Sequence, residues 1–145
     1  MNINLVEGLK EDFPYLFEPR FVLLSKKEAQ RLSSAELMSD DFRIEFEVLD
    51  GMLNVSIRHY YPLEQKYGYW HGLFTYIELF DGHPLEFPEQ VAFASNEMKL
   101  LSRLLLQYMN KLKAFSRERT CEENERKLNE IGKNISERNW KKLGW

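Results

Sequence analysis

The sequence predicts an α+β domain in which an antiparallel sheet of about three to five strands packs against one long helix. Two alternating apolar runs flank Asp50-Gly51, and apolar residues recur three and four positions apart over residues 96–115. Pairs of helix-capping type near both ends of the chain add an N-terminal and a C-terminal helix. We therefore expect a single domain over residues 1–145, organised around a central hairpin.

The hairpin prediction rests on Asp50-Gly51, the residue pair most typical of a two-residue type I′ turn. A turn there pairs residues symmetrically about it and so sets the register of both strands. One face then carries only apolar pairs: Val48 with Leu53, Phe46 with Val55, and Ile44 with Ile57. Glu45 and Glu47 lie on the other face, opposite Ser56 and Asn54, and this face meets either water or a partner.

Before the hairpin, the sequence predicts two helices and one strand. Asn4 and Glu7 resemble an N-cap pair, and Pro14 ends this first helix near Asp12. The apolar run that follows predicts a strand over residues 20–24, buried on both faces. Ser25 with Glu28 then forms a capping box for a short helix through Leu32, and residues 33–41 are expected to be a polar loop.

After the hairpin, residues 70–80 are apolar at both odd and even positions, which indicates a central strand or one whose second face binds something. Residues 81–84, Asp-Gly-His-Pro, predict a turn. The long helix follows over residues 96–115, while residues 88–94 fit either its first turns or a short edge strand.

The final helix is expected to begin after Thr120, which forms a capping box with Glu123, and to end near Gly132 or Asn139. Its apolar stripe is thin: Leu128, Ile131 and Ile135. Because three apolar residues bury little surface, we expect residues 121–145 to pack loosely or to be held by a partner.

Composition limits the class of protein. Cys121 is the single cysteine, the chain starts with polar residues, and no apolar run reaches the length of a membrane span, so we expect a cytoplasmic protein that meets no membrane. Residues 1–100 hold 9 Lys or Arg and 17 Asp or Glu, whereas residues 101–145 hold 11 and 6. One part could meet a basic partner and the other an acidic one, or the two parts could attract each other within the fold.

Few residues suggest chemistry. His59 lies opposite Phe42 on the inward face, near Asp40 and Asp41, where a structural role is favoured over a catalytic or ligand-binding one. Glutamates surround Cys121 and oppose a thiolate, so we expect an inert thiol. The sequence contains no catalytic or phosphate-binding motif, and the spacing of its histidines is not that of a metal site. We predict no catalytic residue, no metal and no cofactor.

Seven aromatic residues crowd residues 60–76, and such a cluster serves either ordinary packing or a protein interface. Base stacking on nucleic acid needs interleaved Lys or Arg residues and is disfavoured, because Lys66 is the only Lys or Arg among residues 60–76. We predict a partner-binding surface made of acidic residues that attract a basic protein and aromatic residues that anchor it. Its predicted members are Asp40, Asp41, Glu45, Glu47, Tyr67, Tyr69 and Trp70.

The hairpin over residues 42–60, the run Tyr67-Gly68-Tyr69-Trp70-His71-Gly72 and the long helix together resemble the immunity proteins that bacteria pair with secreted or contact-delivered toxins. The resemblance implies an inhibitor without catalytic activity that binds a cognate toxin, and many such toxins are basic nucleases. Two alternatives stay open. One is a small-ligand-binding domain or enzyme with a pocket near His59, and the other is a nucleic-acid adaptor that uses the basic C-terminal part.

Overall fold

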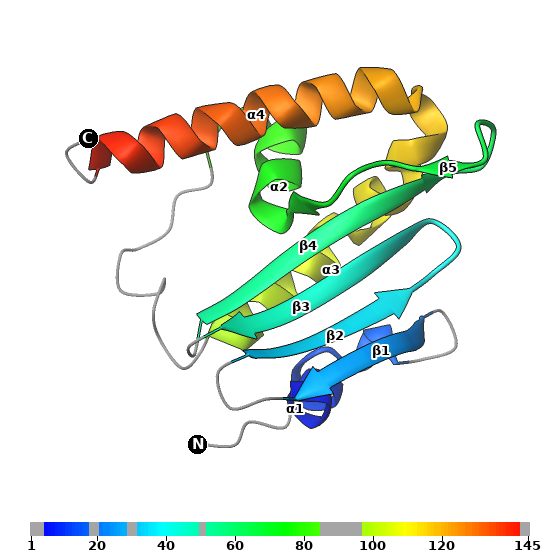
Figure 1. Cartoon of the computed structure of the whole chain (residues 1–145), viewed down its shortest axis with the longest axis vertical. Helices are drawn as coiled ribbons and strands as arrows, with labels where there is room; N and C mark the ends of the chain where they lie inside the picture. The colour runs from blue at the N-terminus through cyan, green and yellow to red at the C-terminus, as the bar shows by residue number, and fades with distance from the viewer. Residues whose placement is uncertain (1–4, 18–20, 29–31, 50–51, 85–96, 143–145) are drawn as a thin grey trace.

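The computed structural model describes residues 5–17, 21–28, 32–49, 52–84 and 97–142 (Figure 1). An antiparallel sheet has strand order β1-β2-β3-β4-β5, and the two-residue strand β6 also pairs with β4. The strands are β1 (Val22–Glu28), β2 (Leu32–Met38), β3 (Phe42–Leu49), β4 (Met52–Tyr61), β5 (Lys66–Tyr67) and β6 (His71–Gly72). The helices are α1 (Leu5–Asp12), the 3-10 turn η1 (Pro14–Leu16), α2 (Leu73–Asp81), α3 (Glu97–Glu118) and α4 (Cys121–Lys142). The predicted α+β class is confirmed.

The central hairpin has the predicted register. Phe46 pairs with Val55 and Ile44 pairs with Ile57, and all four side chains are buried. Asp50 and Gly51 lie outside the described residues. The register follows from the alternation itself, because a slip by one residue would turn this apolar set toward water.

Helices α1 and α3 cover one face of the sheet (Figure 1). The stripe of α3 is buried as predicted, including Leu101, Leu105 and Leu112. Hydrogen bonds tie the N-terminal segment to α3: the Tyr15 hydroxyl donates to the Ser102 carbonyl at 2.7 Å, and Ser102 Oγ donates to the Asp12 carbonyl at 2.5 Å. The first helix ends at Asp12, as expected.

The short helix predicted from Ser25 is wrong, because residues 25–28 belong to β1; residues 29–31 lie outside the described residues. The loop predicted over residues 33–41 is wrong for residues 33–38, which belong to β2, whereas residues 39–41 do lie between strands. The first strand is also not buried on both faces, since Val22 is 59% exposed. As the edge of the sheet, β1 gains its backbone hydrogen bonds from β2 and tolerates polar residues such as Lys26. Sheet pairing therefore overrides the local capping pattern.

The strand predicted over residues 70–80 is also wrong. Only His71 and Gly72 pair with β4, and residues 73–81 form α2. The buried residues Leu73, Tyr76 and Ile77 have helical spacing. The sequence does not reveal this spacing, because other positions of the segment are apolar too. The predicted turn is present: Gly82 ends α2 in the left-handed conformation, with φ 77°, and donates its N–H to the Glu78 carbonyl.

The last helix begins after Thr120 as predicted, with reciprocal capping bonds between Thr120 and Glu123. It continues to Lys142, beyond the predicted ends at Gly132 and Asn139. Leu128 is buried, and polar contacts join α4 to the rest of the chain: Asn124 Nδ2 donates to the Phe115 carbonyl, and Arg138 pairs with Glu78.

Residues 88–94, for which two structures were predicted, lie outside the described residues. Of the described helices, none combines the length and the apolar character that crossing a membrane requires.

Candidate protein-binding surface

The face of the sheet opposite α1 and α3 is covered by no described helix (Figure 1). Alternation along the central strands sends every second side chain to this side. We call it the open face and define it by nine residues: Ser34, Glu36 and Met38 from β2, Arg43, Glu45 and Glu47 from β3, and Asn54, Ser56 and Arg58 from β4. None of these nine is buried, which leaves the open face available to a partner.

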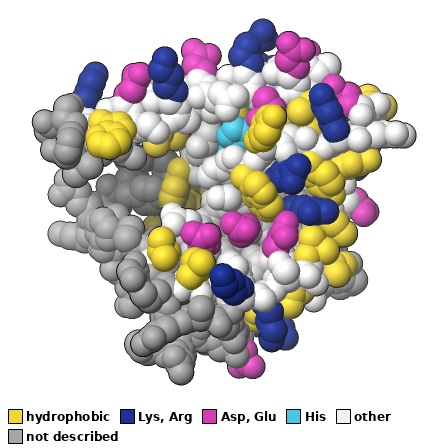
Figure 2. All heavy atoms as spheres, viewed as in Figure 1, with side chains coloured by type: hydrophobic (Ala, Val, Ile, Leu, Met, Phe, Trp, Pro, Cys, Tyr) yellow, Lys and Arg dark blue, Asp and Glu magenta, His cyan; other side chains and the backbone are white. Residues whose placement is uncertain are grey.

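Three carboxylates lie close together on the open face. Glu36 pairs directly opposite Glu45, and Glu47 follows two residues along the same strand. Figure 2 shows acidic side chains in a row across the middle of this face, with basic and hydrophobic side chains beside them. Like charges directly opposite on neighbouring strands destabilise a sheet, so this arrangement is unfavourable for folding alone.

The acidic residues are incompletely neutralised. Arg43 lies 3.7 Å from Glu36, but no described cationic side chain lies within 4 Å of the carboxylates of Glu45 or Glu47. Partial burial raises the pKa of Glu45, and the neighbouring charges of Glu47 and Glu36 raise it further. A cation brought by a partner would relieve this repulsion.

The two arginines of the open face are held by Tyr67. The guanidinium carbons of Arg43 and Arg58 lie 4.7 and 5.0 Å from the centre of the Tyr67 ring. Arg58 Nε also donates to the Gly68 carbonyl at 2.7 Å, and the Tyr67 hydroxyl lies 3.9 Å from the sulfur of Met38. Tyr67 therefore has a structural role within the surface, and it fixes both arginines in place.

Tyr69 and Trp70, in the segment between β5 and β6, have exposed aromatic side chains, at 75% and 38%. Their backbone is nevertheless fixed: the Tyr69 N–H donates to Glu125 Oε1 at 3.0 Å, and Glu125 Oε2 contacts His71 Nε2 at 2.6 Å. Because this backbone is already anchored, the segment would lose little backbone freedom when a partner binds.

Asp40 and Asp41 lie apart from these groups, in the turn between β2 and β3. Asp40 is exposed, whereas Asp41 accepts hydrogen bonds from Arg117 at 2.9 and 3.1 Å. Asp41 is four residues from Glu45, roughly 13 Å along a strand at about 3.3 Å per residue. The seven predicted residues thus divide into an open-face group (Glu45, Glu47 and Tyr67), an exposed aromatic pair (Tyr69 and Trp70) and a separate acidic turn (Asp40 and Asp41).

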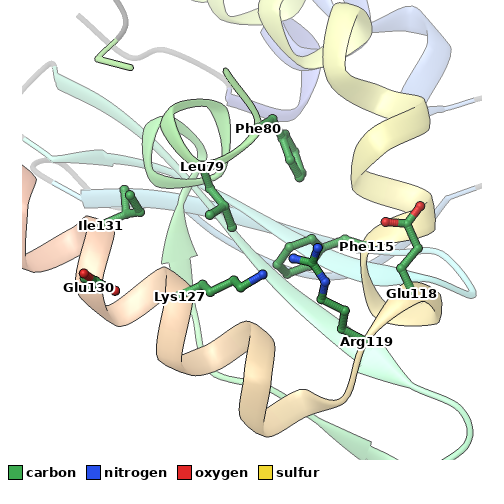
Figure 3. A pocket seen from close by; sticks show the side chains of 8 residues that line it. All are labelled: Leu79, Phe80, Phe115, Glu118, Arg119, Lys127, Glu130 and Ile131. Atoms are coloured by element: carbon green, nitrogen blue, oxygen red, sulfur yellow. The ribbon is translucent and has the colours of Figure 1, made fainter. Parts of the chain in front are cut away.

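A cleft of about 530 Å³ lies elsewhere, among α2, α3 and α4 (Figure 3). It is lined by Leu79, Phe80, Phe115, Glu118, Arg119, Lys127, Glu130 and Ile131. None of the seven predicted residues lines it, and neither does His59.

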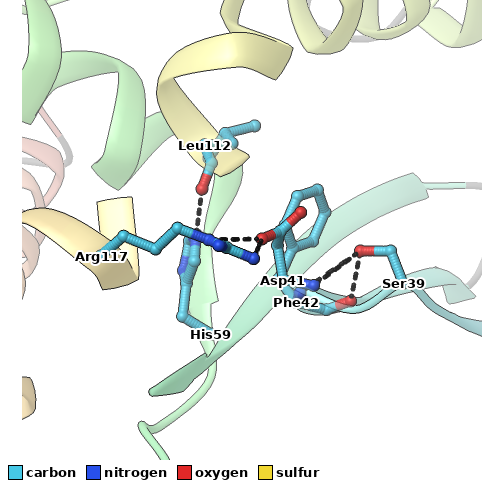
Figure 4. Close-up of polar contacts among 6 residues, drawn as sticks. All are labelled: Ser39, Asp41, Phe42, His59, Leu112 and Arg117. Carbon is cyan, nitrogen blue, oxygen red and sulfur yellow. Dashed lines mark hydrogen bonds and ion pairs between the residues drawn. The ribbon is translucent and has the colours of Figure 1, made fainter. Parts of the chain in front are cut away.

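His59 belongs to the core (Figure 4). Its ring is 1% exposed, Nε2 lies 2.6 Å from the Leu112 carbonyl, and Nδ1 lies 3.2 Å from the Tyr76 hydroxyl. Because a carbonyl can only accept, Nε2 holds the proton of the neutral ring. Burial lowers the pKa of His59 to about 4, although the bond to Leu112 and the charge of Asp41 oppose this effect. Both nitrogens are engaged, which favours the structural role over a catalytic one.

Cys121 is buried, and burial raises the pKa of its thiol, which opposes a thiolate nucleophile. Within the described ranges, no three His, Cys, Asp or Glu side chains are grouped so that they could hold a metal ion.

Sequence reasoning missed Glu36 and Arg43 as part of the surface. Glu36 was missed because the sequence predicts a polar loop over residues 33–41. The alternation of Ala35 and Leu37, both buried, with Ser34 and Glu36 is the signal that could have identified the strand. Arg43 lies on the predicted outer face of the hairpin, but its contact with Tyr67 joins residues 24 positions apart that no local pattern relates.

Comparison with known proteins identifies no relative: the chain matches no protein-family model, no curated protein and no solved structure at a significant level.

Proposed function

We propose that this chain is an immunity-type inhibitor, which neutralises a basic protein toxin by binding it through the open face and the exposed aromatic pair Tyr69 and Trp70. One observation carries the proposal: Glu36 and Glu45 face each other across two strands, beside Glu47, on a sheet face that no described helix covers. This arrangement costs stability in the free protein and becomes favourable only against positive charge.

The surface combines the two properties of a protein interface. Glu45 and Glu47 provide a negative field that attracts a basic partner and orients it during encounter. Tyr69 and Trp70 provide apolar area of the residue types that most often dominate binding energy. The same negative field disfavours nucleic acid at this face, because phosphates would be repelled.

The inhibitor class follows from the resemblance to immunity proteins of the hairpin, the run over residues 67–72 and the long helix. Inhibition by covering a toxin needs a rigid surface and no catalytic residue. The open face meets that requirement, since Tyr67 fixes its arginines and Glu125 fixes the backbone before Trp70.

The test begins with capture of the tagged chain from its own host and identification of the bound protein. The partner should be basic, should stop growth when it is produced alone, and should be harmless when it is produced together with the chain. Glu45→Gln/Glu47→Gln should weaken this protection. The matched control is Glu122→Gln/Glu137→Gln, which removes two exposed carboxylates from α4.

Equal protection by the two double variants would exclude the open face as the binding surface. If no protein is captured and the chain instead carries a metabolite, or shows turnover that His59→Gln abolishes, the inhibitor proposal fails and the ligand-binding or enzyme alternative replaces it.

A further inference from the structure

The cleft among α2, α3 and α4 shares no residue with the open face, so a role for it goes beyond the proposed function. Its volume of about 530 Å³ lies within the range of small-molecule sites, roughly 300–1,000 Å³. It is built from the end of α2, the end of α3 with the following Arg119, and the middle of α4 (Figure 3).

The apolar part of the cleft is aromatic. The rings of Phe80 and Phe115 meet edge to face, with their centres 5.7 Å apart. Leu79 and Ile131 complete this apolar lining and are only partly buried. Such a surface favours a planar apolar group over a flexible polar one.

The charged part of the cleft is positive at its centre. Arg119 and Lys127 extend toward each other across the cleft, while the carboxylates of Glu118 and Glu130 are directed to its two ends (Figure 3). Neither Arg119 nor Lys127 has a carboxylate within 4 Å among the described residues. Two cations that converge without an anion between them repel each other, and an anion bound there would relieve that repulsion.

We propose that this cleft binds a small amphiphilic anion, in which a planar aromatic body rests on Phe80 and Phe115 and its carboxylate, sulfonate or phosphate group lies between Arg119 and Lys127. The guanidinium of Arg119 can donate two parallel hydrogen bonds to such a group, and the ammonium of Lys127 adds a point charge. No bond is made or broken, so the site is a binding site.

The probe is 1-anilinonaphthalene-8-sulfonate, an aromatic anion with a planar naphthalene body, whose fluorescence rises in apolar surroundings. Titration into the folded full chain should give one site. Arg119→Gln/Lys127→Gln should raise the dissociation constant of the dye about tenfold or more, because the loss of a single charge-assisted hydrogen bond weakens binding by about that factor. Arg119 is exposed and Lys127 is only half-buried, so the variant should fold.

The matched control is Arg126→Gln/Lys133→Gln, which removes two exposed cations of α4 that do not line the cleft, and it should bind like the parent chain. The neutral dye N-phenyl-1-naphthylamine should bind much more weakly and should not respond to the cleft variant. Competition by benzoate, benzenesulfonate and phenyl phosphate then identifies the preferred anionic group.

Three outcomes would overturn the proposal: equal binding by the cleft and control variants, equal binding of the charged and neutral dyes, or dye binding that appears only when the near-UV circular dichroism of the folded chain is lost.

Discussion

At the scale of single residues, His59 shows how burial turns a titratable side chain into a structural one. Its ring lies among Phe42, Tyr76 and Phe115, with ring centres 5.0 to 5.4 Å apart, and it bonds to the backbone of α3 through Leu112. A phenylalanine could fill this space but could not donate a hydrogen bond to the Leu112 carbonyl.

Folding should therefore depend on the protonation of His59. Its pKa is about 4 in the folded chain against an ordinary 6.5, so the unfolded chain takes up the proton first as pH falls. The contribution of the neutral ring is complete above pH 6.5 and is lost toward pH 4, in total on the order of 3 kcal/mol at about 1.4 kcal/mol per pKa unit.

Urea denaturation of the parent chain and of His59→Gln between pH 7 and pH 5 measures this contribution. The variant should be less stable at pH 7, and the difference in unfolding free energy should shrink as pH falls. Parallel curves would show that the ring does not titrate with folding.

Protonation of His59 destabilises the folded chain at low pH, whereas ionisation of Glu45 is predicted to destabilise it at higher pH. Burial and two neighbouring carboxylates raise the pKa of Glu45, so the folded chain holds this proton more tightly than the unfolded chain does. Ionised Glu45 thus lowers the stability of the folded chain once the pH rises above the ordinary pKa of a glutamate. Glu45→Gln should therefore raise the melting temperature at pH 7 but not at pH 3.5. Glu122→Gln, on an exposed residue of α4, should not raise it at either pH. A lower melting temperature for Glu45→Gln would mean that the carboxylate has a favourable partner.

At the scale of elements, the segment between β5 and β6 depends on its contact with α4. The backbone at Gly68 approaches Glu125 so closely that an added Cβ would overlap Glu125 Oε1 and lie 3.3 Å from the Tyr61 ring. Glu125 would have to leave the Tyr69 N–H and His71, both of which it satisfies in partly buried surroundings. Glycine at position 68 is therefore a packing requirement.

Gly68→Ala should lower the free energy of unfolding by about 1–3 kcal/mol, the cost of leaving buried polar groups unsatisfied. Gly132→Ala in α4 is the matched control, because a Cβ there meets no atom within 4 Å. That change should stabilise the helix by up to about 1 kcal/mol. Equal effects of the two substitutions in urea denaturation would contradict the close approach at Gly68.

An element could be predicted from the sequence when the residues that determine it lie close together in the chain. The hairpin over residues 42–60 and the start of α4 at Thr120 could be predicted because their signals lie within a few residues. The strand β2 was not predicted, because its buried alternation is confined to Ala35 and Leu37 and its hydrogen bonds come from the distant pairing with β1 and β3. In the candidate surface, Glu45 and Glu47 were placed correctly by register, but the Asp41–Arg117 contact spans 76 positions and leaves no local trace.

At the scale of the whole molecule, the charge asymmetry is partly used within the fold. Asp41 pairs with Arg117 and Glu78 pairs with Arg138, so the acidic and basic parts of the chain do attract each other. Glu45 and Glu47 on the open face are among the acidic residues that no described cation pairs with. Together with Tyr69 and Trp70, they separate the two roles that an interface needs, because long-range charge acts on encounter and buried aromatic area acts on the bound complex.

These roles predict two kinetic signatures with the captured partner, measured by surface plasmon resonance. Glu45→Gln/Glu47→Gln should mainly slow association and reduce its dependence on salt, because the steering field is weaker. Trp70→Ala should mainly speed dissociation, by about thirtyfold if it contributes on the order of 2 kcal/mol. The controls are Glu122→Gln/Glu137→Gln and Trp140→Ala, which change the same residue types at exposed positions of α4. Should a control reproduce its test variant, or should Trp70→Ala leave dissociation unchanged, the partner must bind another face of the molecule.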